Sequence, residues 1–315
     1  MKYGFGIDLG GTTVKLAFFN SNGTMLHKWE IPTVTDNAGE RILPDIAAAI
    51  RTYLTQAQIS DDQLLGIGIG VPGAVTADGV VHQCDNLGWG VFSVEQQLHT
   101  LTGLPVKAGN DASVAALGEC WKGSGQNYRN LVLVTLGTGV GGGIVVDGQL
   151  TYGAHGACGE LGHMVLNRTE TRKCGCGKCG CVEQYCSATG IVRMAKDALQ
   201  VQDHLSSLRS LGNITCKDVF DAAAAGDDVS KAVLEQFYRY LGEFLANIAC
   251  VIDPEVIVLG GGVSKAGPAM ITSLRPHFAH YAYHACRDIP ITIASLGNDA
   301  GAYGAFKLAL DAFGA

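Results

Sequence analysis

The chain has 315 residues, of which 47% are hydrophobic, so it can bury a large core, and its length favours two domains over one. Its formal net charge of -7 provides no basic field for a nucleic acid, and no uninterrupted apolar stretch is long enough to span a bilayer. The first residues lack a secretory signal, and the 11 cysteines fit a reducing compartment. We therefore expect a cytoplasmic protein whose partners are neither nucleic acids nor membranes.

The first part of the chain predicts strands joined by tight turns, followed by one helix. Gly10-Gly11-Thr12-Thr13 separates the first two strands, and Asn22-Gly23 is a strong hairpin signal before the third. Apolar residues at helical spacing follow, with Pro44 near the helix start, where proline is tolerated. The expected strands are residues 3–9, 14–20, 25–31 and 64–71, and the expected helix is residues 40–57. This order predicts a mixed α/β sheet.

A strand and a glycine turn in the middle of the chain repeat this opening. The strand at residues 131–136 meets Gly137-Thr138-Gly139 and returns at residues 143–146 to a turn at Asp147-Gly148, so the chain looks internally duplicated. Gly137 to Gly142 also matches the G-x-G-x-x-G spacing of dinucleotide-binding folds, but there the last glycine opens a helix. A strand follows here, and neither turn carries a G-x-x-x-x-G-K-[ST] motif. A dinucleotide fold and a P-loop are therefore excluded.

The two glycine turns together predict a phosphate site that is split between the halves of the chain. Their backbone N–H groups permit close approach, and Thr12, Thr13 and Thr138 add hydroxyl donors. Either turn alone is more typical of an ordinary hairpin. Asp8 ends an apolar strand just before the first turn, where a carboxylate has no packing value and needs a partner. We expect that partner to be Mg2+, bound directly or through water.

Polar residues between the two halves are candidates for a substrate site. Asn110 or Asp111 is placed to be the N-cap of a helix at residues 112–121, and a cap is the structural alternative to a chemical role for Asp111. Asn86 follows the Asp78-Gly79 turn in a segment that reads as exposed. The structural alternatives to a role in the substrate site are a plain turn residue for Asn86 and a core residue for Trp89.

The last third of the chain predicts two more helices around one strand. The long amphipathic helix is residues 230–251, the strand is residues 255–259 and the final helix is residues 300–312. Gly260-Gly261-Gly262 follows the strand, and a glycine turn after a strand is a usual nucleotide position. This triplet is weak evidence by itself.

Cysteine and histidine are concentrated between residues 159 and 183. Cys174, Cys176 and Cys181, together with His163, form the ligand set of a closed tetrahedral zinc site. Reduced buried thiols and a disulfide framework are the alternatives, but clustered cysteines in an intracellular enzyme are more often metal ligands. Cys179 is able to replace one of the three thiolates, and proximity in sequence does not decide between them.

Five motifs occur in the order that resembles the ROK family of repressors and sugar kinases, and within it the bacterial glucokinases. They are Asp8-Leu9-Gly10-Gly11-Thr12, Asn110-Asp111-Ala112, Leu136-Gly137-Thr138-Gly139, Gly159-Glu160-Leu161-Gly162-His163 and Cys-Gly-Cys-Gly-x-x-Gly-Cys-x-Glu at Cys174 to Glu183. The resemblance covers nearly the whole chain. It implies the actin-like ATPase (ribonuclease H-like) α/β fold, with two lobes, duplicated mixed sheets and a central cleft. The lobes would be residues 1–112, with a helix at about 299–315 packing back on them, and residues 113–298, which carry the zinc loop.

The resemblance also implies roles for individual residues. Asp111 matches the general base that takes the proton of the attacking sugar hydroxyl. The implied sugar contacts are Asn110, Asp111, Glu160, His163 and Glu183, and Gly73 and Asn86 align less certainly with them. The implied ATP and Mg2+ contacts are Asp8, Gly10, Gly11, Thr12, Thr13, Lys15, Gly137, Thr138, Gly139, Gly261 and Gly262. His163 would bind structural zinc with Cys174, Cys176 and Cys181 through one ring nitrogen, and the sugar through the other.

The implied activity is transfer of phosphate from ATP to a hexose, with D-glucose and its 6-hydroxyl as the first expectation. The alternatives are a kinase for N-acetylmannosamine, N-acetylglucosamine, allose or fructose, a polyphosphate-dependent glucokinase, and a sugar sensor without catalysis. Repressor members carry a helix-turn-helix domain before the sugar-binding part, whereas the Asp8 strand here begins at about Tyr3. We therefore expect a kinase, and the resemblance implies a homodimer or homotetramer.

Overall fold

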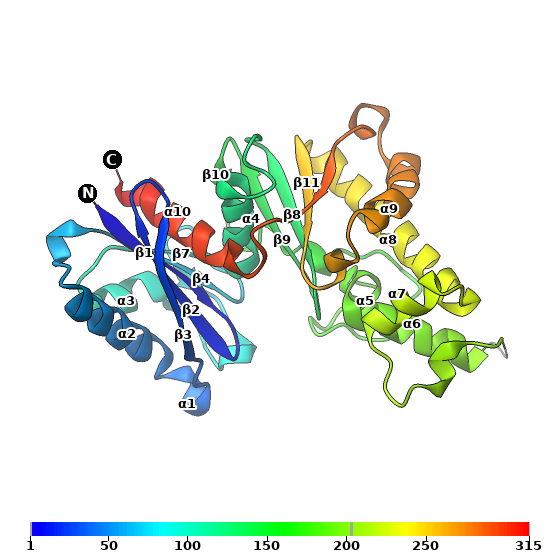
Figure 1. The fold of residues 1–315 in the computed structure, drawn as a ribbon, viewed down its shortest axis with the longest axis horizontal. Coiled ribbons are helices and arrows are strands. Elements are labelled where there is room, and N and C mark those ends of the chain that lie inside the picture. The colour runs from blue at the N-terminus through cyan, green and yellow to red at the C-terminus, as the bar shows by residue number, and fades with distance from the viewer. Residues whose placement is uncertain (1, 202–203, 315) are drawn as a thin grey trace. The chain divides into compact units, whose positions relative to one another are not determined.

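The computed structural model describes residues 2–201 and 204–314, which form two compact units (Figure 1). The first unit runs to Leu133 and also includes Gly143–Gly159 and the residues from Ser295 onward. The second unit consists of Val134–Gly142 and Glu160–Ala294. These boundaries differ from the predicted lobes because helix α4 (Asp111–Lys122) packs against helix α10 (Ala300–Phe313) and so stays in the first unit.

Five strands form the first sheet, in the order β3-β2-β1-β4-β7. The bounds are β1 Tyr3–Leu9, β2 Thr13–Asn20, β3 Met25–Pro32, β4 Leu64–Val71 and β7 Val106–Asn110. Strands β1, β2 and β3 are antiparallel neighbours, whereas β4 and β7 run parallel to β1, which confirms the predicted mixed sheet. A separate two-stranded sheet pairs β5 (Val80–Val81) with β6 (Phe92–Ser93).

The second sheet has the order β10-β9-β8-β11-β12. The bounds are β8 Leu131–Leu136, β9 Val140–Val146, β10 Gln149–Leu150, β11 Val256–Gly260 and β12 Ile291–Ile293. In both sheets the spatial order is third, second, first, fourth and fifth strand, and this equality confirms the predicted duplication. Asp147 and Gly148 both have positive φ, 53° and 77°, as a tight hairpin turn between β9 and β10 requires.

The longer helices flank these sheets. Their bounds are α2 Ile42–Ala57, α3 Val94–Thr102, α4 Asp111–Lys122, α6 Ala188–Val201, α7 Cys216–Ala224, α8 Asp228–Ile252, α9 Pro268–Tyr281 and α10 Ala300–Phe313, and α1 (Asp36–Gly39) and α5 (Glu183–Cys186) are single turns. The four predicted helices are confirmed as α2, α4, α8 and α10, and α3, α6, α7 and α9 were not predicted. In the described ranges, no helix combines the length and apolarity needed to cross a membrane.

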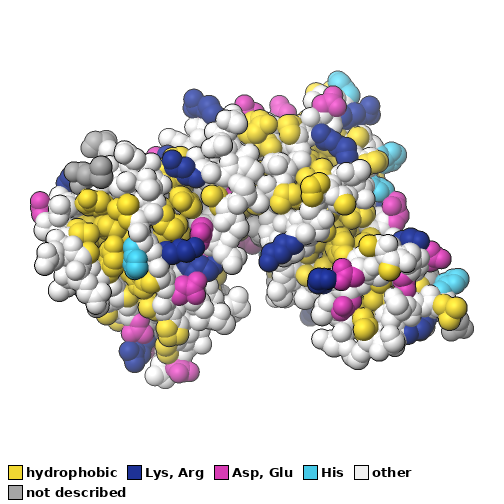
Figure 2. All heavy atoms as spheres, in the orientation of Figure 1, with side chains coloured by type: hydrophobic (Ala, Val, Ile, Leu, Met, Phe, Trp, Pro, Cys, Tyr) yellow, Lys and Arg dark blue, Asp and Glu magenta, His cyan; other side chains and the backbone are white. Residues whose placement is uncertain are grey.

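The core of the first unit lies on both faces of its sheet. Alternate residues of β2 point to opposite faces, so Phe18 packs in the cluster of α2 whereas Phe19 packs against α10. The rings of Phe19 and Phe306 are stacked with centroids 4.6 Å apart. Burial on both faces fixes the sheet between two helices, so the ends of its strands are rigid positions for a site. On the surface, acidic and basic side chains are interspersed over the face in Figure 2.

Candidate active site

The carboxyl ends of three parallel strands bring predicted site residues to one edge of the first sheet. Asp8 of β1 is opposite Gly70 of β4, and the end of β4 is opposite Asn110 at the end of β7. Parallel strands end on the same side, so Asp8 and the Asn110-Asp111 pair share this edge. In open α/β sheets such an edge is the usual ligand position.

The first glycine turn, at Gly10 to Thr13, is closed by its own backbone and by Thr33. The Gly10 N–H donates to the Thr13 carbonyl at 3.0 Å, and the Thr33 hydroxyl donates to the Gly10 carbonyl at 2.7 Å. Lys15 Nζ lies 3.1 Å from Asp8 Oδ2, and the Asp8 side chain is 20% exposed. The carboxylate for which Mg2+ was the expected partner thus has a partner in the chain itself, the Lys15 ammonium group.

Asn110, and not Asp111, is the N-cap of α4. Asn110 Oδ1 accepts from the Ser113 N–H at 3.0 Å, and its amide nitrogen donates to the Gly73 carbonyl at 3.1 Å. Asp111 is the first residue of the helix, and its Oδ1 accepts from the Ala112 N–H at 2.7 Å. The cap, which was the structural alternative for Asp111, is therefore supplied by its neighbour. The same neighbour also fastens the Gly73 loop to the helix start.

The segment that carries Asn86 is a closed loop anchored by Trp89. Cys84 and Trp89 exchange two backbone hydrogen bonds of 3.0 Å, and the Trp89 indole N–H donates to the Gly39 carbonyl at 3.3 Å. Trp89 is only 6% exposed, so the core interpretation of this residue is confirmed. Asn86 is exposed at the tip of the loop.

The second glycine turn lies beside the Gly260–Gly262 triplet. The Gly137 N–H donates to the Gly139 carbonyl at 2.9 Å between β8 and β9. Gly261 approaches so closely that a Cβ on it would lie 2.5–2.7 Å from the Leu136 backbone, and its φ is +82°. Both features require glycine at this position. Because β8 and β11 are neighbours, the two glycine segments predicted as nucleotide contacts in this half lie together.

A pocket of about 470 Å³ opens next to Thr138 in the second unit. Its lining includes apolar Val192 and Ile214, together with the polar side chains of Thr189 and Lys196. Sequence reasoning missed these residues because it did not predict α6 or α7. The helical spacing of apolar residues in α6, at Ile191, Met194 and Ala195, was the signal that could have found the element.

Four predicted metal ligands converge in the second unit. One ligand atom from each of His163, Cys174, Cys176 and Cys181 lies within 4.8 Å of the others. The Cys174 Sγ to His163 Nδ1 distance is 3.7 Å, and the Cys176 Sγ to Cys181 Sγ distance is 3.6 Å. Tetrahedral zinc with Zn–S bonds of about 2.3 Å and Zn–N bonds of about 2.1 Å places its ligand atoms about 3.6 to 3.8 Å apart. The donor set and these two distances therefore suit a zinc ion.

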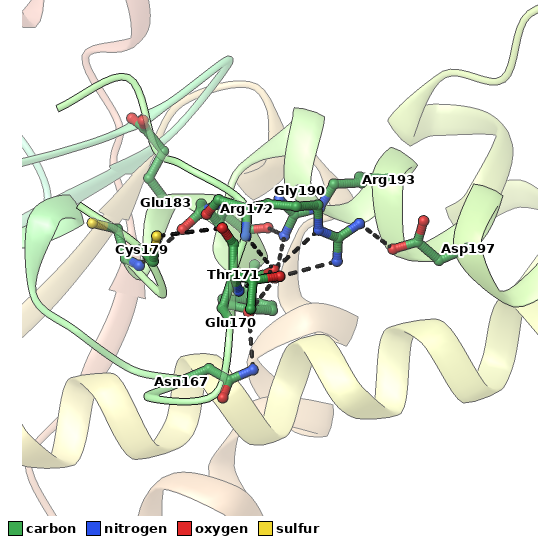
Figure 3. Close-up of polar contacts among 12 residues, drawn as sticks. Asn167, Glu170, Thr171, Arg172, Cys179, Glu183, Gly190, Arg193 and Asp197 are labelled. Atoms are coloured by element: carbon green, nitrogen blue, oxygen red, sulfur yellow. Dashed lines mark hydrogen bonds and ion pairs between the residues drawn. The ribbon is translucent and has the colours of Figure 1, made fainter. Parts of the chain in front are cut away.

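Cys179 lies apart from these four ligand atoms. Its thiol donates to the Thr171 carbonyl at 3.5 Å, as Figure 3 shows, and its backbone bridges to Lys173. His163 is oriented with Nδ1 toward Cys174, whereas Nε2 lies 3.8 Å from Glu160 Oε2. One ring nitrogen thus faces the thiols and the other faces the predicted sugar side. Burial raises the pKa of the Cys181 thiol to about 12, so it needs a cation to become a thiolate ligand.

Glu183 has structural partners in the second unit. Its Oε2 accepts from the Val140 N–H at 3.1 Å, and its Oε1 lies 3.6 Å from Cys174 Sγ. In Figure 3 the Glu183 side chain points away from the contacts between Glu170 and Arg172. The predicted sugar ligand therefore also joins the cysteine cluster to the start of β9.

Comparison with known proteins gives one family for the whole chain. The model of the ROK family matches residues 4–312, which confirms the resemblance drawn from the five motifs. A glucokinase of Halalkalibacterium halodurans is 44% identical over 306 residues, which are 95% of this chain and 92% of that protein. The crystal structure of a ROK family glucokinase from Streptomyces griseus, in complex with glucose and AMPPNP, superposes with a TM-score of 0.76 at 30% identity, covering 98% of this chain and 99% of that one. A xylose repressor of Caldicellulosiruptor bescii is 29% identical over 86% of this chain and 68% of its own length.

Proposed function

The chain belongs to the ROK family, and on that premise we propose that it is an ATP-dependent hexose kinase that phosphorylates D-glucose at the 6-hydroxyl. The observation that carries this proposal is the start of α4. Asn110 caps the helix and ties down the Gly73 loop, which leaves Asp111 at the carboxyl edge of the sheet that also carries the first glycine turn. The glucokinase relatives, one of them crystallised with glucose and AMPPNP, support the same substrates.

Asp111 is the proposed general base. Phosphoryl transfer needs little covalent chemistry from the protein, so positioning and charge stabilisation have to supply the rate. The Asp111 carboxylate would accept the proton of the sugar hydroxyl as that oxygen attacks the γ-phosphorus. Asp111 lies in the first turn of α4, where a negative charge interacts favourably with the partial positive charge of the helix N-terminus.

The two glycine turns are the proposed phosphate cradles. The backbone N–H groups of each turn, with the hydroxyls of Thr12 and Thr13 in the first and of Thr138 in the second, suit phosphate oxygens. Lys15 adds a cation beside the first turn. Asp8 offers the partly exposed carboxylate oxygen that suits Mg2+, which when bound supplies charge neutralisation of the phosphates.

The pocket beside Thr138 is the proposed position of the adenosine group. Apolar side chains of Val192 and Ile214 suit a planar base, and Lys196 offers a polar group to the ribose or the α-phosphate. The pocket lies next to the second glycine turn, so one nucleotide would reach from the pocket to the phosphate cradle.

The proposed hexose contacts are those that the family resemblance implies. They are Asn86, Asn110 and the Gly73 loop in the first unit, and Glu160, His163 and Glu183 in the second. The zinc held by the cysteines would not touch the phosphate. It would fix the loop so that His163 presents Nε2 to a sugar hydroxyl.

A coupled assay of ADP release across a panel of hexoses and N-acetylated amino sugars tests the proposed function. We expect turnover with Mg2+ and ATP to be fastest with D-glucose. Faster turnover with N-acetylmannosamine, N-acetylglucosamine, allose or fructose would reassign the substrate. Turnover with polyphosphate but not with ATP would reassign the donor.

A sugar sensor without catalysis is the second candidate, because a xylose repressor aligns with 86% of this chain. The same assay separates the two functions. Glucose binding without ADP release from any sugar would favour the sensor.

A further inference from the structure

The second glycine turn is held by the segment that directly follows the cysteine cluster. The Ala188 N–H donates to the Gly137 carbonyl at 2.8 Å, and the Thr189 hydroxyl donates to the Thr138 carbonyl at 2.7 Å. The Val140 N–H donates to Glu183 Oε2 at 3.1 Å. Three successive peptide groups of the turn are therefore bonded to one short segment, Glu183 to Thr189, and all partners belong to the second unit.

These contacts fix the groups that would bind phosphate. A peptide unit is planar, so its carbonyl and the following N–H point in opposite directions. When Ala188 holds the Gly137 carbonyl, the direction of the Thr138 N–H is set, and when Thr189 holds the Thr138 carbonyl, the direction of the Gly139 N–H is set. Ala188 and Thr189 thus orient the N–H groups of Thr138 and Gly139, which are the two donors that would bind phosphate.

Packing at Gly139 and Gly162 shows how closely the metal loop approaches the turn. A Cβ on Gly139 would lie 2.2 Å from Glu183 Oε2. A Cβ on Gly162, between Glu160 and His163, would lie 2.1 Å from the Val140 carbonyl oxygen. The start of β9 is therefore enclosed between Glu183 and the loop of His163, so a displacement of either one is transmitted to the turn.

The segment from Glu183 to Thr189 depends in turn on the cysteine loop. Glu183 Oε1 lies 3.6 Å from Cys174 Sγ, and the Gln184 side chain accepts from the Cys181 N–H at 3.1 Å. The Ser187 hydroxyl donates to the Glu183 carbonyl at 2.6 Å and lies 2.9 Å from the Thr189 hydroxyl. A continuous set of close polar contacts thus leads from the cluster to the donor group of Thr189, and its link from the Cys181 N–H to Gln184 does not depend on a thiol proton.

We propose that Glu183 and Thr189 are positioning residues through which the metal-filled cysteine cluster orders the nucleotide turn, so that the metal raises the affinity for ATP in the absence of sugar. The inference rests on the proposed function, because it requires that ATP binds at Gly137–Gly139. A metal that joins His163 to Cys174, Cys176 and Cys181 closes the loop and restricts its alternative conformations. The loop then holds Glu183 against Val140.

The test is calorimetric binding of Mg2+ and a non-hydrolysable ATP analogue to the full chain without sugar. The Thr189→Val substitution removes one hydrogen bond and keeps the shape, so we expect affinity to fall about tenfold with the zinc content unchanged. Thr189→Ser keeps the hydroxyl, and we expect affinity within about twofold of the wild type. Wild type stripped by a chelator should lose at least as much affinity as Thr189→Val, and added zinc should restore it.

Cys179→Ser is the matched control for the loop, because Cys179 lies apart from the four ligand atoms, and it should keep both zinc and nucleotide affinity. If chelation unfolds the protein, the comparison of Thr189→Val with Thr189→Ser decides. Equal affinity of loaded wild type and folded Thr189→Val would overturn the inference and leave the proposed function in place. Failure of loaded wild type to bind the analogue at all would overturn the proposed function, and the inference with it.

Discussion

The sequence Gly-Asn-Asp-Ala occurs twice, at Gly109–Ala112 and at Gly297–Ala300, and the two copies have different surroundings. The first copy spans the end of β7 and the start of α4, and the second copy forms a short turn after β12 that leads into α10 at Ala300. The two helices pack against each other. In both copies the four residues thus lie where the chain passes from the fifth strand of a sheet to the next helix, and their different contacts are informative about function.

The aspartates of the two copies are paired differently. Asp299 forms an ion pair with Lys28 of β3, with both carboxylate oxygens within 3.1 Å of Nζ. In the first copy Asn110 supplies the cap and binds the Gly73 carbonyl, and Asp111 follows it as the first helical residue. We infer that the second copy supports the fold, whereas the first copy carries the chemistry. Residue type and topology are the same, so the surroundings decide the role.

The largest expected effect is on kcat, and it should separate the two aspartates when each is replaced by asparagine. Asp111→Asn keeps the shape but removes the base, so kcat should fall by about 10²- to 10⁴-fold while glucose still binds. Asp299→Asn weakens a partly exposed ion pair worth roughly 0–1 kcal/mol and should leave kcat near the wild-type value. Steady-state kinetics and glucose calorimetry on both variants give the comparison. Parallel loss of glucose binding and turnover in Asp111→Asn would make this residue structural as well.

The second effect concerns the cysteine loop, which lies between β10 and β11. The sequence between the corresponding strands of the first half, β3 and β4, contains no cysteine. Purified protein should contain about one zinc per chain, and Cys176→Ser should lose it, because a closed site needs all four ligands. Cys179→Ser should keep it. Elemental analysis, with glucose affinity measured alongside, tests both variants. Active wild-type enzyme without any metal would contradict the zinc assignment.

Glu170 provides a pH-dependent test of the same region. Hydrogen bonds from Arg172, aided by Tyr185, lower the pKa of this carboxyl from 4.5 to about 2, and its side chain is 7% exposed. The folded state binds the proton less tightly than the unfolded state, so the stabilisation is complete above pH 4.5 and is lost as the pH falls toward 2. At pH 7, Glu170→Gln should lower the free energy of unfolding by about 1–3 kcal/mol.

The destabilisation by Glu170→Gln should shrink on acidification, which urea unfolding at several pH values measures. Asp221→Asn is the control, because Asp221 pairs with Lys217 on an exposed face of α7 and such pairs contribute roughly 0–1 kcal/mol. A Glu170→Gln effect that stays constant between pH 7 and the acid limit would show that the ion pair with Arg172 is not the source of stability.

The smallest expected effect comes from replacing each of the two asparagines, Asn110 and Asn298, by alanine. Asn110→Ala removes an N-cap and should cost about 1 kcal/mol of stability, and it should raise the KM for glucose because the Gly73 loop is released. Asn298 makes no cap contact in the described part of the chain, since Asp299 is the residue at the helix boundary. Asn298→Ala should therefore change thermal stability less. Thermal unfolding of the two variants ranks them, and a larger loss from Asn298→Ala would reverse the assignment of the two copies.

Much of the fold was predictable because strong local signals coincide with the tertiary structure. The strands at Tyr3–Leu9, Leu64–Val71 and Leu131–Leu136 begin and end where the apolar runs predict. The turn at Asn22-Gly23 joins β2 to β3 as its residue types require. Helix α9 was missed because Pro276 interrupts its pattern and its apolar face is narrow.

The site was predictable where its residues are close in sequence and less so where they are brought together by folding. The cysteine cluster could be read from spacing, but the separation of Cys179 depends on its contact with Thr171. Nothing local indicates that Lys15 pairs with Asp8 or that Glu183 reaches Val140. The sequence alone does not decide whether Asn110 or Asp111 is the cap, since both residue types are good caps. The backbone conformation identifies Asn110.

The most direct measurement is detection of the product itself. Wild-type protein, D-glucose, ATP and Mg2+ are incubated with a glucose 6-phosphate dehydrogenase as reporter, in parallel with Asp111→Asn and Asp299→Asn. We expect glucose 6-phosphate from the wild type and from Asp299→Asn, and little or none from Asp111→Asn. Wild-type levels of glucose 6-phosphate from Asp111→Asn would contradict the role of Asp111 as general base, and none from the wild type would contradict the proposed function.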